Sequence, residues 1–332
     1  MGLTERLDRY QRRHRGLGLP LSVLYKFADD QGFYLAALIT YYGFLSLFPL
    51  LLVLATVLGF LLPAHPWLQQ QLIDSALSQF PIIGDQLTSS TQPLRGSGVG
   101  LVTGVLVALY GGLGVAVAIQ NALDQVWGVP VNKRPNPLLA RLRSLSLLGL
   151  LGLGLVLTTA LAAVAGVGER FGPVVRWAAV AASTAVNCGL FLLAFRALTA
   201  RSVSARQVLP GAVLAAVAWQ VLQSVGAMYV DSQLRGSTQV YGLFSIVLGL
   251  MAWIYAEAVV IVLAAELNVV VAERLWPRSL LGPFVEDVDL TRADRRSYTS
   301  YAVAQRYRES EDIDVEFRPR SDAAETDDHP DP

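Results

Sequence analysis

Long runs of apolar residues, separated by short polar segments, dominate the chain between about residues 33 and 272. A helix needs about 20 mostly apolar residues to cross roughly 30 Å of hydrocarbon. Six runs meet this requirement, and they predict membrane spans at about 33–62, 98–119, 144–168, 173–196, 208–230 and 240–272. The pattern therefore predicts an all-α, polytopic membrane protein with six transmembrane helices.

The distribution of basic residues predicts how these spans are oriented. Twenty-two of the 26 Lys and Arg residues lie before the first span, in the second and fourth loops, or after the last span. Because basic segments are retained in the cytoplasm, both termini are expected to be cytoplasmic. An even number of spans agrees with this alternation.

Two segments flank the first span. Residues 1–32 form a basic arm, which is expected on the cytoplasmic side. Residues 63–97 carry apolar side chains at helical spacing opposite polar ones, which predicts an amphipathic extracytoplasmic helix. This helix either lies on the outer membrane interface or caps the bundle by packing on other loops.

The segment that follows the last span, residues 273–332, is expected to be a charged cytoplasmic tail. Acidic residues outnumber basic ones in it and aliphatic residues are few, so most of it is expected to be disordered. A short helix is predicted from Thr291 to about Arg308, with Thr291 as N-cap and Asp294 at the third helical position.

Composition restricts the chemistry of the chain. It has one cysteine and three scattered histidines, and we find no phosphate-binding loop, nucleophile elbow or zinc-protease helix. Metal-dependent hydrolysis and ATP hydrolysis are therefore not expected, and no cofactor is predicted. The basic residues follow membrane topology rather than a nucleic-acid-binding module, so no nucleic-acid partner is expected.

Carboxyl groups in the last predicted span are the most informative polar residues, because a charge at the centre of a membrane helix costs about 2.5–3.5 kcal/mol. Glu257 is expected in the cytoplasmic half of the membrane, and Glu266 and Asn268 near its inner boundary. At about 100° per residue, Glu257 and Glu266 point to opposite sides of the helix. They are therefore not expected to form one catalytic carboxylate pair.

Each carboxyl has two interpretations. Glu257 is either a proton-coupling or headgroup-binding group in an inner-facing cavity, or a packing residue that is neutral or paired with Arg196. Glu266 has the same two interpretations, and the one favoured is packing at the helix end with Arg141, Arg143 or Arg196.

Further polar residues are candidates to line a cavity, although hydrogen bonding between helices explains them comparably well. In the first span these are Tyr41, Tyr42 and Ser46, with Pro49 expected to kink the helix. Asp124 is expected on the cytoplasmic side, together with Asp29 and Asp30.

Several short segments carry motifs of a known family. Ala36–Pro49 reads AALITYYGFLSLFP, which resembles the first-span signature of the YihY/virulence-factor BrkB family of bacterial inner-membrane proteins, and Tyr241–Gly242 opens the last span as in that family. Asn121–Trp127 (NALDQVW) resembles the segment after its second span, which adds Asn121 to the candidate residues. Ala264–Asn268 (AAELN) resembles its Gly-Ala-Glu-Leu block, with Ala264 where the family usually has Gly. Glu257 lies outside the family pattern.

The resemblance extends from about residue 20 to residue 278 and implies six spans in the bacterial cytoplasmic membrane. Members are often labelled ribonuclease BN, and others are linked to envelope integrity and to lipid or lipopolysaccharide export. The acidic tail lies outside the resemblance.

The hypothesis favoured by these observations is a protein that translocates or exports a lipid-like or amphiphilic solute in envelope maintenance, with membrane lipids as its partners. A scaffold that binds other membrane proteins, and a cytoplasmic partner through its tail, is the alternative. Self-association remains open. A membrane-associated ribonuclease is the third hypothesis, disfavoured because a metal-binding cluster is missing, so the chain is not expected to be an enzyme.

Overall fold

The computed structural model is helical, with no strand in the residues that it describes. These are chiefly 14–61, 113–136, 139–144, 173–229, 235–280 and 290–317, with isolated positions between 8 and 12, at 67 and 70, and between 149 and 157. The elements are α2 (Arg15–Asp29), α3 (Gly32–Leu61), η1 (Val131–Lys133), α8 (Pro173–Leu198), α9 (Ala205–Tyr229), α10 (Arg235–Ala272) and α11 (Arg292–Ala304). Residues 113–126 are helical as well. The all-α prediction is confirmed for this part of the chain.

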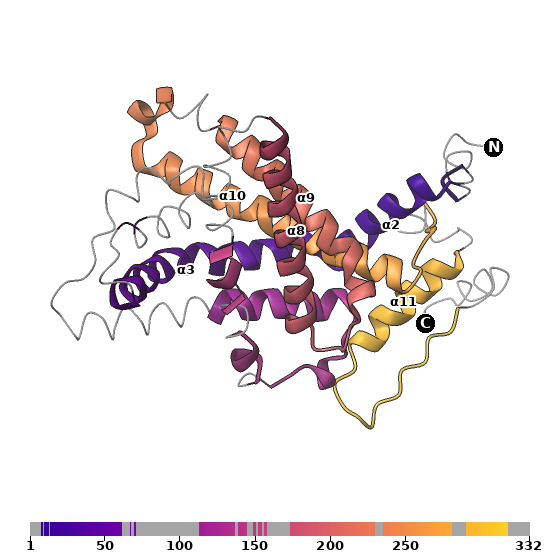
Figure 1. Cartoon of the computed structure of the whole chain (residues 1–332). Helices are drawn as coiled ribbons and strands as arrows, with labels where there is room; N and C mark the ends of the chain where they lie inside the picture. The colour runs from indigo at the N-terminus through magenta and orange to yellow at the C-terminus, as the bar shows by residue number, and fades with distance from the viewer. Residues whose placement is uncertain are drawn as a thin grey trace.

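Helix α10 occupies the centre of the bundle (Figure 1). It packs against α3, α9 and α2, while α8 packs on the other side of α9. Its 38 residues correspond to about 57 Å at a rise of about 1.5 Å per residue. Because this exceeds the thickness of the hydrocarbon, α10 must tilt in a membrane or project beyond it.

Three described helices are long and apolar enough to cross a membrane. They are Trp177–Leu198, Ala205–Gly226 and Val247–Ala272, and Gly32–Leu47 is a shorter apolar helix. Residues 98–112 and most of 144–168 lie outside the described residues, so the count of six and the sidedness stay predictions. The amphipathic helix expected over 63–97 also lies outside them, apart from residues 67 and 70. Helix α3 continues through position 49, whose side chain is not described.

The N-terminal arm and the start of the tail lie at the same end of the bundle. The side chain of Gln11 donates to the carbonyl of Arg278 over 2.6 Å, and the backbone N–H of Leu280 donates to Asp8 over 3.0 Å. The hydroxyl of Tyr25 also donates to the carbonyl of Leu280, over 2.7 Å. Because the two segments lie at the same end, the chain between them must cross the membrane an even number of times.

Small residues allow the helices to approach closely. A Cβ atom on Gly211 of α9 would lie 2.0 Å from the carbonyl oxygen of Ala264 on α10, so only glycine fits this crossing. Fully buried alanines lie at Ala212, Ala215 and Ala264. By contrast, side chains on the outer faces are about half exposed, as expected for lipid-facing positions. Examples are Leu45, Leu193, Val217, Val221 and Leu248.

The arm that precedes the first span contains a helix that the sequence analysis did not identify. Helix α2 ends at Asp29, and Gln31, with a φ of 57°, turns the chain into α3. Gly32 follows directly, and any Cβ there would lie 2.4 Å from the ring of Phe27. This turn directs α2 across the end of α10 rather than along α3 (Figure 1).

The tail contains the predicted short helix, and the disorder expected for most of the tail stays a prediction. The predicted cap is confirmed, because the Thr291 side chain accepts from the N–H of Asp294 while Asp294 accepts from the N–H of Thr291. The helix ends at Ala304 rather than near Arg308. Ala293, Asp294 and Ser297 are buried, so α11 is docked on the bundle. Residues 318–332 lie outside the described residues.

Candidate functional site

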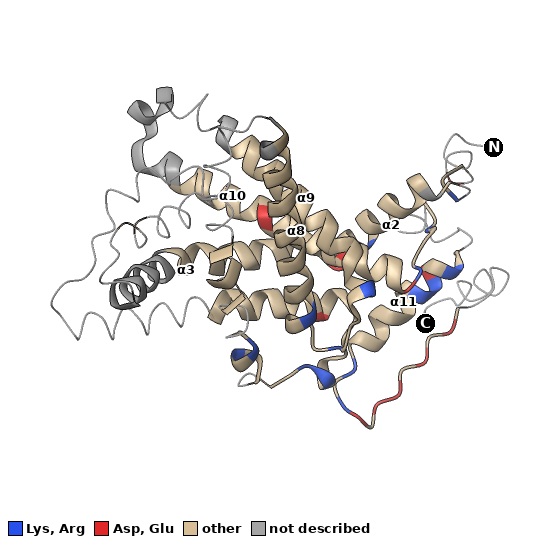
Figure 2. Ribbon diagram, viewed as in Figure 1, with Lys and Arg blue, Asp and Glu red and all other residues tan. Residues whose placement is uncertain are grey.

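Charged residues gather where α2, the end of α10 and α11 meet (Figure 2). We refer to six of them as the charged junction: Lys26, Asp29, Asp30, Glu266, Arg278 and Asp294. They come from the end of α2 and the turn after it, and from a distant part of the sequence that includes the end of α10, the loop after it and α11. Four of the six side chains are at most 3% exposed, so the junction is part of the interior of the protein.

The first half of the junction is centred on Lys26. Its ammonium lies 3.0 Å from Oε2 of Glu266, pairs with Asp30 one turn later in the chain, and donates to the carbonyl of Val126 over 2.8 Å. Two of the three N–H donors of the ammonium form hydrogen bonds, to Asp30 and to the carbonyl of Val126, and Glu266 is held as an ion pair. Gln125 also donates to the carbonyl of Asp30 over 2.8 Å, so residues 113–128 are tied to α2 at this point.

Two carboxyl groups face one ammonium here, and all three side chains are almost fully buried. Burial raises the pKa of Asp30, and the charge of Lys26 offsets only part of this effect. Burial alone would lower the pKa of Lys26, but Glu266 and Asp30 outweigh it and the pKa is raised. Lys26 therefore stays charged, and the carboxyl pair carries an excess negative charge unless one group keeps its proton.

The second half of the junction is centred on Arg278. Its guanidinium bonds Asp29 over 2.5 Å and Asp294 over 3.1 Å, and it lies between the rings of Tyr25 and Tyr298. Burial would lower the pKa of Arg278, but the hydrogen bond and charge of Asp29 outweigh it, so the pKa is raised. Because Asp294 also caps α11, one carboxyl joins the tail helix to the bundle.

Tyr301 of α11 connects the two halves. Its hydroxyl donates to Asp29 over 3.1 Å, and its ring lies 5.9 Å from the ammonium of Lys26. Burial, together with the negative charges of Asp30 and Asp29, raises the pKa of Tyr301. The tyrosine therefore remains a neutral hydrogen-bond donor at physiological pH.

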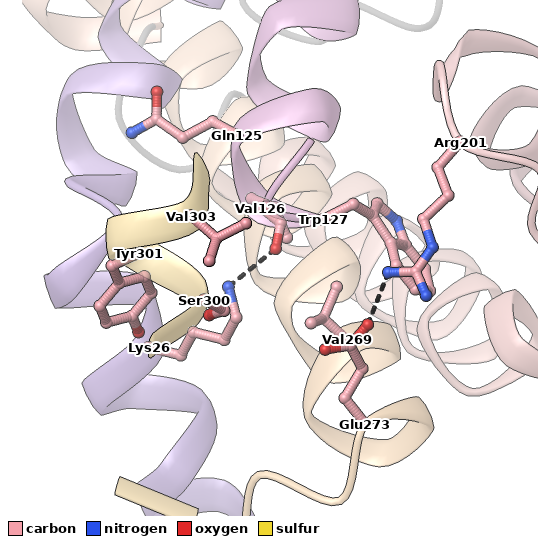
Figure 3. A pocket seen from close by; sticks show the side chains of 11 residues that line it. Lys26, Gln125, Val126, Trp127, Arg201, Val269, Glu273, Ser300, Tyr301 and Val303 are labelled. Carbon is pink, nitrogen blue, oxygen red and sulfur yellow. Dashed lines mark hydrogen bonds and ion pairs between the residues drawn. The ribbon is translucent and has the colours of Figure 1, made fainter. Parts of the chain in front are cut away.

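A small cavity of about 110 Å³ borders the junction (Figure 3). Lys26, Gln125 and Tyr301 line one side of it, and Trp127, Arg201 and Glu273 the other. Arg201 pairs with Glu273 over 2.6 Å and stacks on Trp127. The volume is sufficient for several water molecules.

The outcome for Glu266 differs from the expected pairing. It contacts Lys26 instead of Arg141, Arg143 or Arg196, because α2 crosses the end of α10 and supplies a cation that hydropathy alone did not place. Arg196 donates to the carbonyl of Val203 over 3.3 Å.

Glu257 is buried in α10 and its side chain approaches the indole of Trp253, one turn earlier. No described residue hydrogen-bonds its Oε1 atom, and no ion pair to Arg196 occurs in the described part of the chain. By helical periodicity Glu257 shares a face of α10 with Asn268, opposite Glu266.

Asn268 fixes that face against α9. Its Oδ1 accepts from the backbone N–H of Gly211 over 2.6 Å, whereas its amide nitrogen has no hydrogen-bond partner among the described residues. These contacts agree with the prediction that Glu257 and Glu266 point to opposite sides of α10. Glu266 contacts α2, whereas Asn268, on the same side as Glu257, contacts α9.

The remaining candidates are not brought together. Asp124 is buried, which raises its pKa, and it accepts from the N–H of Ala200 over 2.7 Å between α8 and α9. Asn121 is exposed, as is Tyr41. Ser46 donates to the carbonyl of Gly43 within its own helix. The remaining first-span tyrosine, Tyr42, packs against Gly114.

The family described as virulence factor BrkB matches residues 23–283. The chain belongs to the BrkB family. It is 30% identical over 252 residues to the inner membrane protein YhjD of Escherichia coli, which covers 69% of this chain and 74% of that protein. It is 25% identical over 256 residues to the putative ribonuclease-like protein YfkH of Bacillus subtilis, covering 72% and 90%. No solved structure matches the chain significantly.

Membership of the BrkB family makes the chain a membrane protein, in agreement with its apolar helices. Two of the segments that resemble the family meet at the charged junction, since one carries Gln125 and Val126 and the other carries Glu266. The sequence placed Asp29 and Asp30 at the same end of the bundle as Glu266, which the contacts confirm, but it did not reveal the pairing of Lys26. The four-residue spacing of Lys26 and Asp30 was the available signal.

Proposed function

We propose that the protein translocates an amphiphilic, lipid-like solute across the bacterial cytoplasmic membrane, as part of envelope maintenance. The observation that carries the proposal is the buried carboxyl of Glu257, whose Oε1 atom has no hydrogen-bond partner among the described residues. A polar atom buried without a partner is costly, so such an atom in a membrane helix suggests a ligand or a proton.

The surroundings of Glu257 favour a solute with a polar head and an apolar chain. Its face of α10 also carries the amide nitrogen of Asn268, a second buried polar atom without a described partner. Asn268 lies 11 residues beyond Glu257, or about 16 Å along the helix axis, so a headgroup bound at Glu257 does not reach it, and the two atoms mark separate positions along this face. The outer face of α9 is apolar and about half exposed at Val213, Val217 and Val221, so the chain of the solute could remain in lipid beside it.

Native mass spectrometry of gently purified protein tests this binding. Wild type should retain an amphiphile, and Glu257→Gln should lose it, because a lost hydrogen bond to a charged group of about 1.5–3 kcal/mol corresponds to roughly a tenfold or larger fall in occupancy. Glu273→Gln is the matched control, since Glu273 pairs with Arg201 near the surface. The same bulk lipid mixture on all three proteins would count against the proposal.

A scaffold role is separated from transport by truncating the tail. Removal of everything after Leu280 would also remove Asp294, and it would leave Arg278 without one of its two carboxylate partners. Truncation after Phe317 avoids this problem, because α11 stays docked. A transporter should keep its activity without residues 318–332, whereas a scaffold that binds partners through them should lose it.

We do not extend the ribonuclease-like name of YfkH to this chain. The carboxyls of Asp30 and Glu266 are occupied by Lys26, and Asp124 accepts a backbone hydrogen bond. RNA degradation by purified protein, abolished by Glu266→Gln or Asp124→Asn, would revive the enzymatic hypothesis.

A further inference from the structure

Helix α2 has one buried face and one exposed apolar face. Ser22, Val23, Lys26 and Phe27 are at most 7% exposed and face the bundle. On the opposite side lies an apolar stripe, which we define as Leu17, Pro20, Leu24 and Ala28, with Tyr10 before it. Leu17 is 54% exposed and Leu24 is 56% exposed. Two large aliphatic side chains this open on one helical stripe favour contact with an apolar partner or a non-aqueous environment.

The depth of α2 relative to the spans is fixed by its contacts. Lys26 pairs with Glu266, six residues before the end of α10, which corresponds to about 9 Å along the helix axis. At the start of α3, Phe33 is 60% exposed and Tyr34 is 75% exposed. Exposed aromatic residues at the end of a span are typical of the headgroup level. The end of the stripe that is closer to α3, at Ala28, therefore lies at the level of the membrane surface. At this level α2 turns away from the axis of α3 (Figure 1).

The charge of the preceding residues matches one particular surface. Residues 5–15 contain five arginines and two acidic residues, so the beginning of the arm is cationic. An amphipathic helix with an apolar stripe and basic residues beside it binds the interface of membranes that contain anionic lipids. We propose that α2 lies in the headgroup region of the cytoplasmic leaflet, with Leu17 and Leu24 among the acyl chains, and that the net positive charge of the sequence before it favours anionic lipid.

This arrangement gives α2 contacts with two different environments. Its apolar stripe contacts lipid, while Lys26 on the other face is paired with α10. The lipid composition of the leaflet therefore affects the helix whose Lys26 balances the charge of Glu266. The inference does not depend on the nature of the transported solute.

Spin labels on single cysteines test the proposal in nanodiscs. In a Cys188→Ala background, Leu17→Cys and Leu24→Cys probe the stripe, and these exposed positions are expected to accept a label without loss of the fold. Leu45→Cys on the outer face of α3 is the lipid-facing control, and Glu309→Cys in the exposed tail is the aqueous control. The readout is the relaxation of each label by oxygen, which partitions into lipid, against a water-soluble nickel chelate.

The two stripe labels should resemble the Leu45 label, and their protection from nickel should increase when anionic lipid replaces zwitterionic lipid. Labels that resemble the Glu309 control in both lipids would overturn the proposal. Strong spin–spin coupling between stripe labels would also overturn it, because the stripe would then be covered by a second copy of the chain. Protection that is equal in both lipids would contradict the preference for anionic lipid.

Discussion

Lys26 and Glu266 form a buried ion pair with 3.0 Å between the ammonium and the carboxyl oxygen, although they lie near opposite ends of the region that matches the BrkB family. The pair joins the N-terminal helix to the last apolar helix. Asp30 and the carbonyl of Val126 complete the coordination of the ammonium. Lys26 therefore contacts three segments at once, namely its own helix α2, α10 and residues 113–126.

Replacing Lys26 with Met should strongly destabilise the protein. The change leaves Glu266 and Asp30 buried without a cation, and breaking a buried pair from one side typically costs about 3–5 kcal/mol. Unfolding in detergent, followed by circular dichroism, measures the effect. The double variant Lys26→Met/Glu266→Gln should recover part of the loss. Arg201→Ala is the control, since the Arg201–Glu273 pair is largely exposed and should contribute less than about 1 kcal/mol.

The pH dependence of stability should reflect the raised pKa of Asp30, whose ordinary value is 3.8. Between that value and the raised value, the folded protein binds more protons than the unfolded chain, so the contribution of Asp30 to stability falls as the pH rises. Thermal unfolding between about pH 4 and pH 8 should show a shallower decline for Asp30→Asn than for wild type.

Other charged or titratable groups near Asp30 also affect how stability depends on pH. Lys26, Glu266, Asp29, Arg278 and Tyr301 face it from α2, α10 and α11. Lys26 should contribute at higher pH, because its raised pKa keeps its stabilising effect intact until the pH rises above its ordinary value of 10.5. Identical slopes for Asp30→Asn and wild type would contradict the assignment.

The cap of α11 should determine whether the tail helix stays docked. Thr291→Ala removes one capping hydrogen bond and should cost about 1 kcal/mol. Asp294→Ala should cost more, because it removes the cap and also one partner of the buried Arg278. Hydrogen exchange of residues 292–304 measures both effects. Equal protection of this helix in the two variants would show that the ion pair does not hold it.

The crossing of α9 and α10 should not tolerate a side chain at Gly211. A Cβ atom there would lie 2.0 Å from the carbonyl oxygen of Ala264, so Gly211→Ala should separate the helices and cost about 1–3 kcal/mol or more. Gly189→Ala in α8 is the control. Nothing lies within 4 Å of a Cβ at Gly189, so alanine should stabilise that helix by up to about 1 kcal/mol. Comparable loss in both variants would argue against a specific contact.

The long apolar runs predicted the helical class and the approximate bounds of α8, α9 and α10, because membrane helices must satisfy their backbone internally. The cap of α11 could be predicted as well, because Thr291 and Asp294 carry a local signal. The partner of Glu266 could not be predicted in the same way. It depends on the turn at Gln31, a tertiary feature that brings α2 across α10.

The central claim, that an amphiphile is moved past Glu257, is tested most directly by flux in vesicles. Wild type, Glu257→Gln and Glu273→Gln are reconstituted with a fluorescent lipid, and its transfer between leaflets is measured by chemical quenching. The account predicts transfer above that of protein-free vesicles for wild type and Glu273→Gln, and a fall of roughly tenfold or more for Glu257→Gln. Transfer equal to that of protein-free vesicles in all three, or equally fast transfer by Glu257→Gln and wild type, would contradict it.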